Sequence, residues 1–435
     1  MLVRFLFVLF IINSLLSQSF GSEFEYSQTS VYTFQSFLQP YGRNTNETLN
    51  IVSISPDLRK RWENKLSMRI NPKIIFQPDN KSSEERLLIN PSELFVKYKA
   101  EGFQMQAGSS VYNWGVTNIY NPMDFINSRA YFNPLVPEKI GVLNLTSNIK
   151  LPQGYLDLLF IPKNNKSKLP GSQSRWLPRE LYIPEGSNGM TTLLMPNEIS
   201  YTLLDDPDDE GALSNNFGLR YGTSYKSLDF SIAFYEGMSL QPLIIPKVTG
   251  VIKEISPRTV IAIDPEVSLL TKFYKRRNLG FTLVFDNKFG LLKIVTNYIS
   301  NQHEDGLLPN WSNESTIEIE ENFTLSDKSS FVGFAQINSV SSSLESKSNL
   351  NFQNIFKNSV IFGAKYFVRE DTVLTPVILQ DLESNSSLMN LSIEKGVKEN
   401  LKINFAIIQI DGSRESPLGI FSKNDDVSLS VIGYF

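Results

Sequence analysis

Few residues of this sequence have side chains that could perform enzymatic chemistry. The 435 residues include one His, His303, and no Cys. The lack of Cys excludes thiol catalysis, iron–sulfur clusters and Cys-based zinc sites, and a single His argues against a multi-His metal centre. A serine nucleophile needs a base that a third group orients, and His303 falls in a polar loop rather than in a strand pattern. We therefore predict no catalytic residue, no metal site and no cofactor.

The charged residues do not indicate a nucleic-acid partner either. Lys and Arg number 41 against 45 Asp and Glu, so the formal charge is −4 and no basic surface is expected. The densest acidic run, Asp205–Glu210, lacks the Gly and the spaced ligands of a calcium loop. We interpret this run as a solvated loop.

Polar side chains instead recur at every second position of apolar segments, which is a pattern suited to lining a water-filled passage. In residues 228–235, Leu, Phe and Ile alternate with Asp, Ser, Ala and Tyr. Alternation with period two places one set of side chains on each face of a β-strand. The polar members that we predict to line a lumen are Arg220, Asp229, Glu318, Glu320 and Glu394.

The elements that position these residues are predicted to be many antiparallel strands. Segments such as Gly141–Leu151 have the 9–11 residues of a tilted transmembrane strand. Tight turns such as Glu101-Gly102 alternate with long polar loops such as Lys163–Pro196, and this is the layout of an outer-membrane barrel. We predict an all-β fold, a single antiparallel transmembrane β-barrel over residues 23–435 with an even strand count near 16 and a range of 14–18.

The first 22 residues are predicted to be a signal peptide. Arg4 precedes the apolar run Phe5–Leu16, which is shorter than the roughly 20 residues that a membrane-spanning helix needs. A membrane anchor is the alternative interpretation of this run.

The last segment, Val427–Phe435, alternates and ends in an aromatic residue. It resembles the signal by which bacterial outer-membrane barrels are recognised by their assembly machinery. The resemblance implies that Phe435 is an assembly signal and that this machinery is a partner.

One long connection without a strand pattern, residues 112–139, carries a second resemblance. It contains Trp114-Gly115 and Asn121-Pro122-Met123-Asp124, followed by Arg129. This resembles a segment of large porin-like outer-membrane families of Gram-negative bacteria, which implies a barrel of porin type and little about the solute.

From the residues alone, Asn118 or Asn121 could cap a short helix in this segment. Two placements remain open: a loop packed at one rim, with Trp114 in the aromatic girdle, or a loop folded into the lumen. In the lumen, opposed charges on Asp124 and Arg129 would produce a transverse field. The constriction candidates are Trp114, Asn121, Asp124 and Arg129.

Together these patterns predict a porin-like channel for passive diffusion of small solutes across the bacterial outer membrane. Its partners would be outer-membrane lipids, the barrel-assembly machinery and small solutes, with no nucleic acid. A structural or adhesive outer-membrane barrel is one alternative. A secreted β-sandwich binding protein is an alternative of another class.

Overall fold

The computed structural model describes residues 24–42, 44–63, 65–179, 191–194, 196, 198–254, 259–302, 307–326, 329–343, 355–413 and 416–435. The predicted signal peptide and His303 lie outside the described residues. Among the described residues, no helix is both long enough and apolar enough to cross a bilayer.

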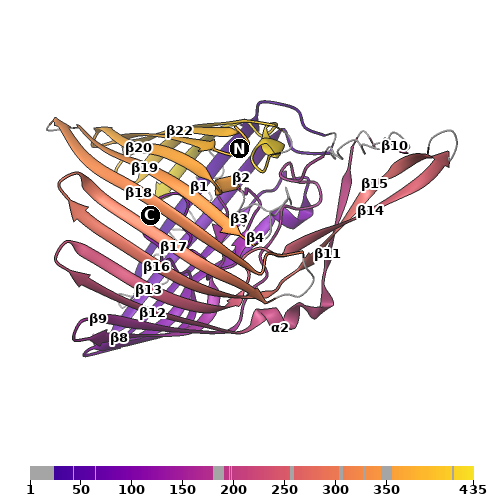
Figure 1. Cartoon of the computed structure of the whole chain (residues 1–435). Coiled ribbons are helices and arrows are strands. Elements are labelled where there is room, and N and C mark those ends of the chain that lie inside the picture. The colour runs from indigo at the N-terminus through magenta and orange to yellow at the C-terminus, as the bar shows by residue number, and fades with distance from the viewer. Residues whose placement is uncertain are drawn as a thin grey trace.

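Eighteen strands form one closed antiparallel ring (Figure 1). Each ring strand pairs with the ring strands that precede and follow it in the chain. The first strand, β1, pairs with both β2 and the last strand, β24, and this pairing closes the ring. The ring strands are β1 (Glu25–Phe37), β2 (Thr48–Trp62), β3 (Leu66–Phe76), β4 (Leu87–Ala100), β5 (Phe103–Ser110), β8 (Val142–Leu151), β9 (Gly154–Lys163), β12 (Ser214–Tyr225), β13 (Leu228–Met238), β16 (Lys275–Asn287), β17 (Gly290–Gln302), β18 (Trp311–Ser326), β19 (Ser329–Ser342), β20 (Ser359–Arg369), β21 (Thr372–Asp381), β22 (Ser387–Lys398), β23 (Leu401–Asp411) and β24 (Asp426–Tyr434).

The predicted all-β antiparallel barrel is confirmed, and its 18 strands lie at the upper limit of the predicted range. A single sheet closed on itself is not the pair of stacked sheets that defines a sandwich, so the β-sandwich alternative was wrong. Closure leaves no unpaired strand edge in the ring.

Period-two alternation separates the two faces of the barrel wall. In β18, Ile317 and Ile319 are 47% and 44% exposed, whereas Glu318 between them is fully buried. Strand register extends the exposed face from strand to strand, because Ile317 lies beside Ile294 of β17 and Ile337 of β19. The outward residues thus form a continuous apolar surface, and the polar residues face the interior.

The two ends of the barrel differ in the length of their connections. Tight turns join strand pairs at one end, as at Gly102, which adopts a φ of +71° between β4 and β5. The other end carries the long connections, and the chain end at Phe435 lies at the tight-turn end beside Gln28. Short helices lie in these long connections: η1 (Ser83–Glu85), η2 (Pro207–Asp209), α2 (Glu210–Leu213) and η4 (Gly419–Phe421).

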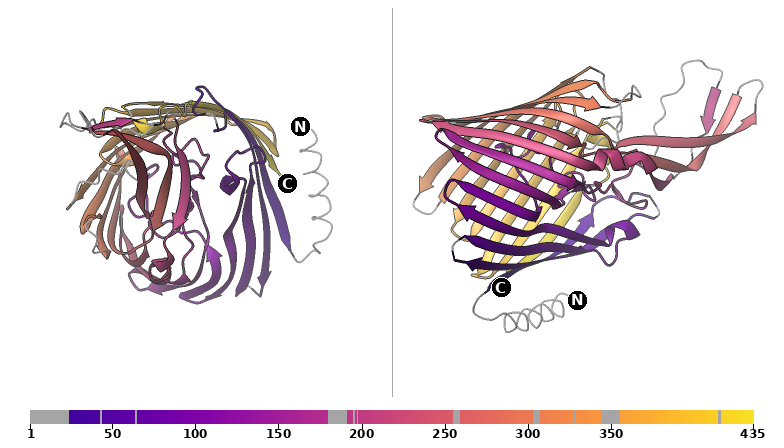
Figure 2. Two further views of the ribbon diagram at one scale, coloured as in Figure 1. Left: turned by 90° about the vertical axis from the view of Figure 1, so that its right-hand side faces the viewer. Right: turned by 90° about the horizontal axis from the view of Figure 1, so that it is seen from below.

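A small second sheet projects from the long-loop end, away from the barrel (Figures 1 and 2). Its strands are β10 (Thr191–Leu194), β11 (Ser200–Asp205), β14 (Leu243–Glu254) and β15 (Thr259–Lys272). The central strand, β15, pairs antiparallel with β14 on one edge and parallel with β10 and β11 on the other.

The packed core lies inside the barrel rather than between sheets. Figure 2 (left) looks into the ring and shows the long connections within it. One buried cluster joins Trp114, Met123 and Phe125 to side chains of the wall. A second gathers Tyr131, Leu169, Trp176, Ile355 and Phe421 from different connections. The long connections therefore pack against one another and against the inner wall.

Candidate functional site: a chain segment folded into the barrel

The segment 112–139, between β5 and β8, lies inside the ring against the inner face of the wall. Two wall glycines allow its close approach. A Cβ at Gly218 of β12 would meet the Trp114 ring at 2.8 Å, and a Cβ at Gly280 of β16 would meet the Met123 sulfur at 1.8 Å. Trp114 is 5% exposed and therefore lies in the interior core, not in an outward aromatic girdle.

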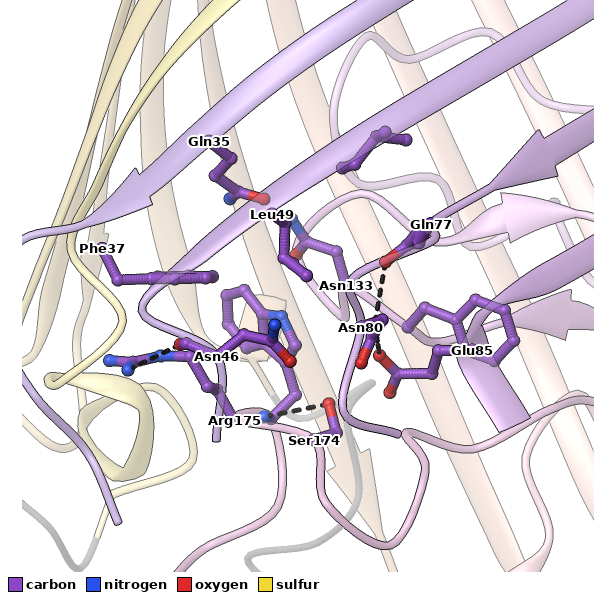
Figure 3. Close-up of a pocket in the computed structure, with 13 residues that line it drawn as sticks. Gln35, Phe37, Asn46, Leu49, Gln77, Asn80, Glu85, Asn133, Ser174 and Arg175 are labelled. Carbon is purple, nitrogen blue, oxygen red and sulfur yellow. Dashed lines mark hydrogen bonds between the residues drawn. The ribbon is translucent and has the colours of Figure 1, made fainter. Parts of the chain in front are cut away.

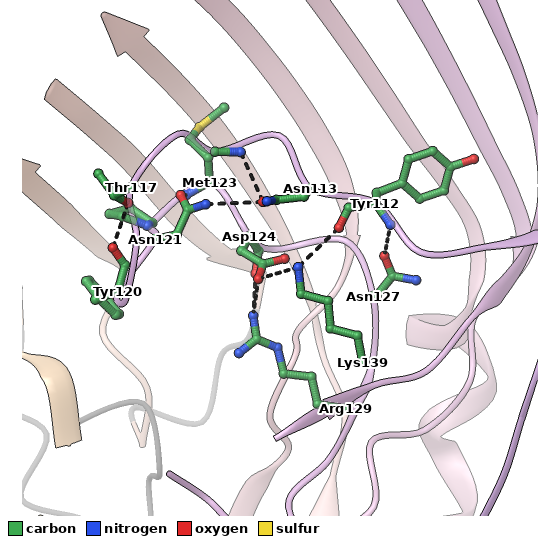
Figure 4. Close-up of polar contacts among 12 residues, drawn as sticks. Tyr112, Asn113, Thr117, Tyr120, Asn121, Met123, Asp124, Asn127, Arg129 and Lys139 are labelled. Atoms are coloured by element: carbon green, nitrogen blue, oxygen red, sulfur yellow. Dashed lines mark hydrogen bonds and ion pairs between the residues drawn. The ribbon is translucent and has the colours of Figure 1, made fainter. Parts of the chain in front are cut away.

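Local hydrogen bonds hold the segment as a chain of turns (Figure 4). The Asn121 carboxamide oxygen accepts from the Met123 backbone N–H at 3.0 Å, and its Nδ2 donates to Asn113 Oδ1 at 3.2 Å. Asn121 thus caps a turn at Asn-Pro. The short helix that Asn118 or Asn121 could cap does not form, because residues 112–139 contain no helix. The segment also contains a two-residue ladder of β6 (Arg129–Ala130) and β7 (Glu138–Lys139).

Asp124 and Arg129 contact each other directly. Asp124 Oδ2 lies 2.7 Å from the Arg129 guanidinium and 2.7 Å from Lys139 Nζ (Figure 4). The expectation of opposed charges across the lumen was therefore wrong for this pair. These ion pairs instead connect Asp124 to the β6–β7 ladder of the same segment, which contains Arg129 and Lys139.

Two predicted lumen residues, Glu318 and Glu320, bind the segment to the wall. The Asn118 backbone N–H donates to Glu318 at 2.8 Å, and Asn118 Nδ2 donates to both carboxylates. Lys293 of β17, which sequence reasoning missed, lies 2.8 Å from each carboxylate. The register that pairs Lys293 with Glu318 makes this contact possible.

The other predicted lumen residues are dispersed around the inner face. Arg220 of β12 donates to the Tyr155 hydroxyl and stacks on its ring at 5.4 Å. Glu394 of β22 pairs with Lys402 at 2.8 Å, and Asp229 is exposed near the tight-turn end of β13. None of these three residues contacts Glu318 or Glu320.

The segment and the wall enclose a cavity of about 280 Å³. Predicted residues Asn121, Asp124 and Arg129 line it, together with Arg276 of β16 and Glu314 of β18. Tyr120 donates its hydroxyl hydrogen to Glu314 at 2.9 Å, and its backbone oxygen accepts from Gln336 of β19 at 2.6 Å. Three of the four constriction candidates therefore lie at one cavity, and Trp114 packs behind it.

A smaller cavity, of about 90 Å³, lies nearer the long-loop end (Figure 3). Arg175 holds its rim by donating to backbone oxygens of Gln39, Asn46 and Lys423, and burial lowers the Arg175 pKa to about 10. Burial also raises the pKa of the Glu85 carboxyl, although Asn80 and the Gly171 N–H donate to it. These bonds connect four separate loops across the mouth.

In the comparison with known proteins, only solved structures are similar to this chain. No family model and no curated protein matches the chain. Among solved structures, the chain is similar to Salmonella typhi OmpF in complex with daunomycin, at 7% identity and a TM-score of 0.44, over 95% of this chain and 97% of that one. It is also similar to a mutant of Rh. blastica porin, at 8% identity and a TM-score of 0.42, over 95% and 100%. The fold assignment above depends on the closed strand ring itself.

Proposed function

We propose that this protein is a porin-like channel of the bacterial outer membrane that lets small solutes diffuse passively through its lumen. The observation that carries the proposal is the closed 18-stranded ring with a continuous apolar outer surface. Soluble proteins rarely expose contiguous apolar patches larger than a few hundred Å². In hydrocarbon, a closed barrel satisfies every backbone polar group of its strands.

The inner face supports a water-filled passage, because it carries ionised and amide side chains at alternating positions. The segment 112–139 would narrow this passage and set which solutes pass. Outer-membrane lipids would surround the wall, and no catalytic residue is required. The predicted signal peptide and Phe435 would direct export and assembly.

A structural or adhesive role is the second candidate. The packed interior clusters and the projecting sheet of β10, β11, β14 and β15 favour it, because a filled barrel conducts poorly and an external sheet can contact other surfaces. Conductance separates the two candidates. The purified protein, refolded in detergent and added to planar bilayers, should produce discrete ion-conducting steps. Complete absence of steps from correctly folded barrels would favour the structural role.

Removing the segment tests its place in the passage. Deletion of Asn118–Arg129 should raise single-channel conductance, because it removes chain from the lumen. The matched control deletes an equal length, Val251–Ala262, from the projecting β14–β15 hairpin and should leave conductance unchanged. Parent-like conductance in an assembled Asn118–Arg129 deletion would place the segment outside the permeation path.

A further inference from the structure

Arg276 is a buried cation that forms no ion pair with any carboxylate of the described residues. It lies on the inner face of β16, is 5% exposed and lines the 280 Å³ cavity. Its Nε has no hydrogen-bond partner, and among the described residues no carboxylate oxygen lies within the 4.0 Å of an ion pair. The adjacent Arg277 points outward, is 57% exposed and pairs with Glu236 at 2.8 Å.

Such burial is costly without a counter-charge. Arginine stays protonated in proteins, and a desolvated charge is stable only when it is paired and hydrogen-bonded. Asp124 cannot serve, since Arg129 and Lys139 already share it. Glu314, the other acidic residue of the cavity lining, accepts a hydrogen bond from the neutral Tyr120 hydroxyl and lies beyond ion-pair distance of Arg276.

The charges of the cavity lining are equal in number but are not paired at Arg276. The lining supplies two cations, Arg129 and Arg276, and two carboxylates, Asp124 and Glu314; Arg129 pairs with Asp124, whereas Arg276 forms no ion pair among the described residues. Arg129 Nε is also buried without a hydrogen-bond partner. Unused guanidinium donors on a buried, unpaired cation are suited to an anion.

The remaining lining is largely apolar, and the space is large enough for an organic molecule. One water occupies roughly 30 Å³ in the liquid, far less than the cavity. Apolar side chains and proline rings form most of the other walls: Ile119, Phe125, Leu135, Val136, Leu240 and Phe356. A ligand that matches this lining has one anionic head and a compact carbon skeleton.

We propose that this cavity binds small organic acids, with the Arg276 guanidinium holding the carboxylate and the apolar walls holding the carbon skeleton. This proposal rests on the proposed function. If the barrel is a channel, organic anions are a class of solute that binds within its passage. Arg276, rather than the paired Asp124 and Arg129, is then the residue that selects the solute.

Calorimetric titration of the full chain, folded in detergent, tests the site with three probes of similar size: benzoate, benzyl alcohol and benzylamine. Benzoate should bind saturably to one site, and the neutral and cationic probes should bind at least tenfold more weakly. Arg276→Gln should weaken benzoate binding about tenfold or more, because a charge-assisted hydrogen bond is lost. Arg277→Gln, one residue away on the outer face, should bind benzoate as the parent does.

Two results would overturn the inference: parent-like benzoate affinity in Arg276→Gln, or equal affinity of the parent for benzoate and benzyl alcohol. The second comparison needs no variant, so it decides even if Arg276→Gln does not fold. Conductance separates this site from the proposed function. Arg276-dependent binding by a barrel that does not conduct contradicts the channel alone, and conductance without such binding contradicts the site alone.

Discussion

At the residue scale, Lys293 forms ion pairs with two carboxylates inside the barrel. Glu318 is fully buried and Glu320 is partly buried, and Lys293 lies 2.8 Å from both. Breaking a buried ion pair by removing one partner leaves an uncompensated charge, which is more damaging than losing an exposed pair.

Lys293→Met should therefore lower the free energy of unfolding by about 3–5 kcal/mol. Lys402→Met removes a similar cation from Glu394, but both partners are more than a third exposed, so the expected loss is about 0–1 kcal/mol. Denaturant unfolding of the barrels in lipid vesicles, followed by tryptophan fluorescence, measures both values. Equal losses would show that the Lys293 site is as solvated as the Lys402 site.

Sequence patterns predicted the inward direction of Glu318 and Glu320 but not their partner. Parity within one strand is local information, whereas the meeting of Lys293 with Glu318 depends on the register of β17 against β18. Asp209 shows the same limit. We expected it in a solvated acidic loop, but it is 2% exposed, contacts Lys166 at 2.8 Å and accepts from the Phe273 N–H.

At the element scale, each ring strand has an outer and an inner face that should respond differently to charge. Leu391 and Ser392 are neighbours near the middle of β22, with Leu391 on the outward apolar face and Ser392 on the inward face. Leu391→Lys should destabilise the protein by about 2–4 kcal/mol if it lies near the bilayer midplane.

Ser392→Lys should be tolerated, because its cross-strand neighbours are Thr375 and Ala406 and it retains partial exposure. Unfolding in vesicles compares the two variants. Similar stability of both would contradict a lipid-facing outer surface. Ser231 would be a poor choice for the inward control, since it is 4% exposed and shares a hydrogen bond with Thr282.

The strands were more predictable than the segment between them. Alternation predicted a strand over Gly141–Leu151, and β8 spans Val142–Leu151. The length of 112–139 indicated a folded-in or rim element, but its path depends on Gly218 and Gly280, which lie in distant strands. Alternation also does not distinguish ring strands from β14 and β15, which pair outside the ring.

At the scale of the whole molecule, the closing seam joins β1 to β24. The Phe435 N–H donates to the Gln28 oxygen, and the Gln28 N–H donates to the Phe435 oxygen, each at 2.9 Å. The Phe435 ring lies over Gly433, where a Cβ would meet it at 2.9 Å. The last residue thus contributes both backbone pairing and an aromatic ring to the seam.

Deleting Phe435, or replacing it with Asp, should prevent assembly into the outer membrane and leave export intact. Phe435→Ala keeps both backbone hydrogen bonds and removes only the ring, so it separates recognition of the aromatic from closure of the seam. Phe435→Tyr is the control and should assemble normally. Heat-dependent mobility on gels of membrane fractions measures folding. Normal assembly of the Asp variant would contradict the role of Phe435 as an assembly signal.

Because β24 closes the seam, it is the strand that a separate peptide can replace. Thr33 and Ser430 share a hydrogen bond across the seam although 397 positions separate them in the chain. A chain that lacks its last strand therefore keeps 17 ring strands but has two open edges, on β1 and β23, of the kind that recruit foreign strands. A synthetic peptide with the sequence of Asp426–Phe435 fits between those edges, as donor-strand complementation does elsewhere. Supplied in trans, it would close the ring without a covalent link.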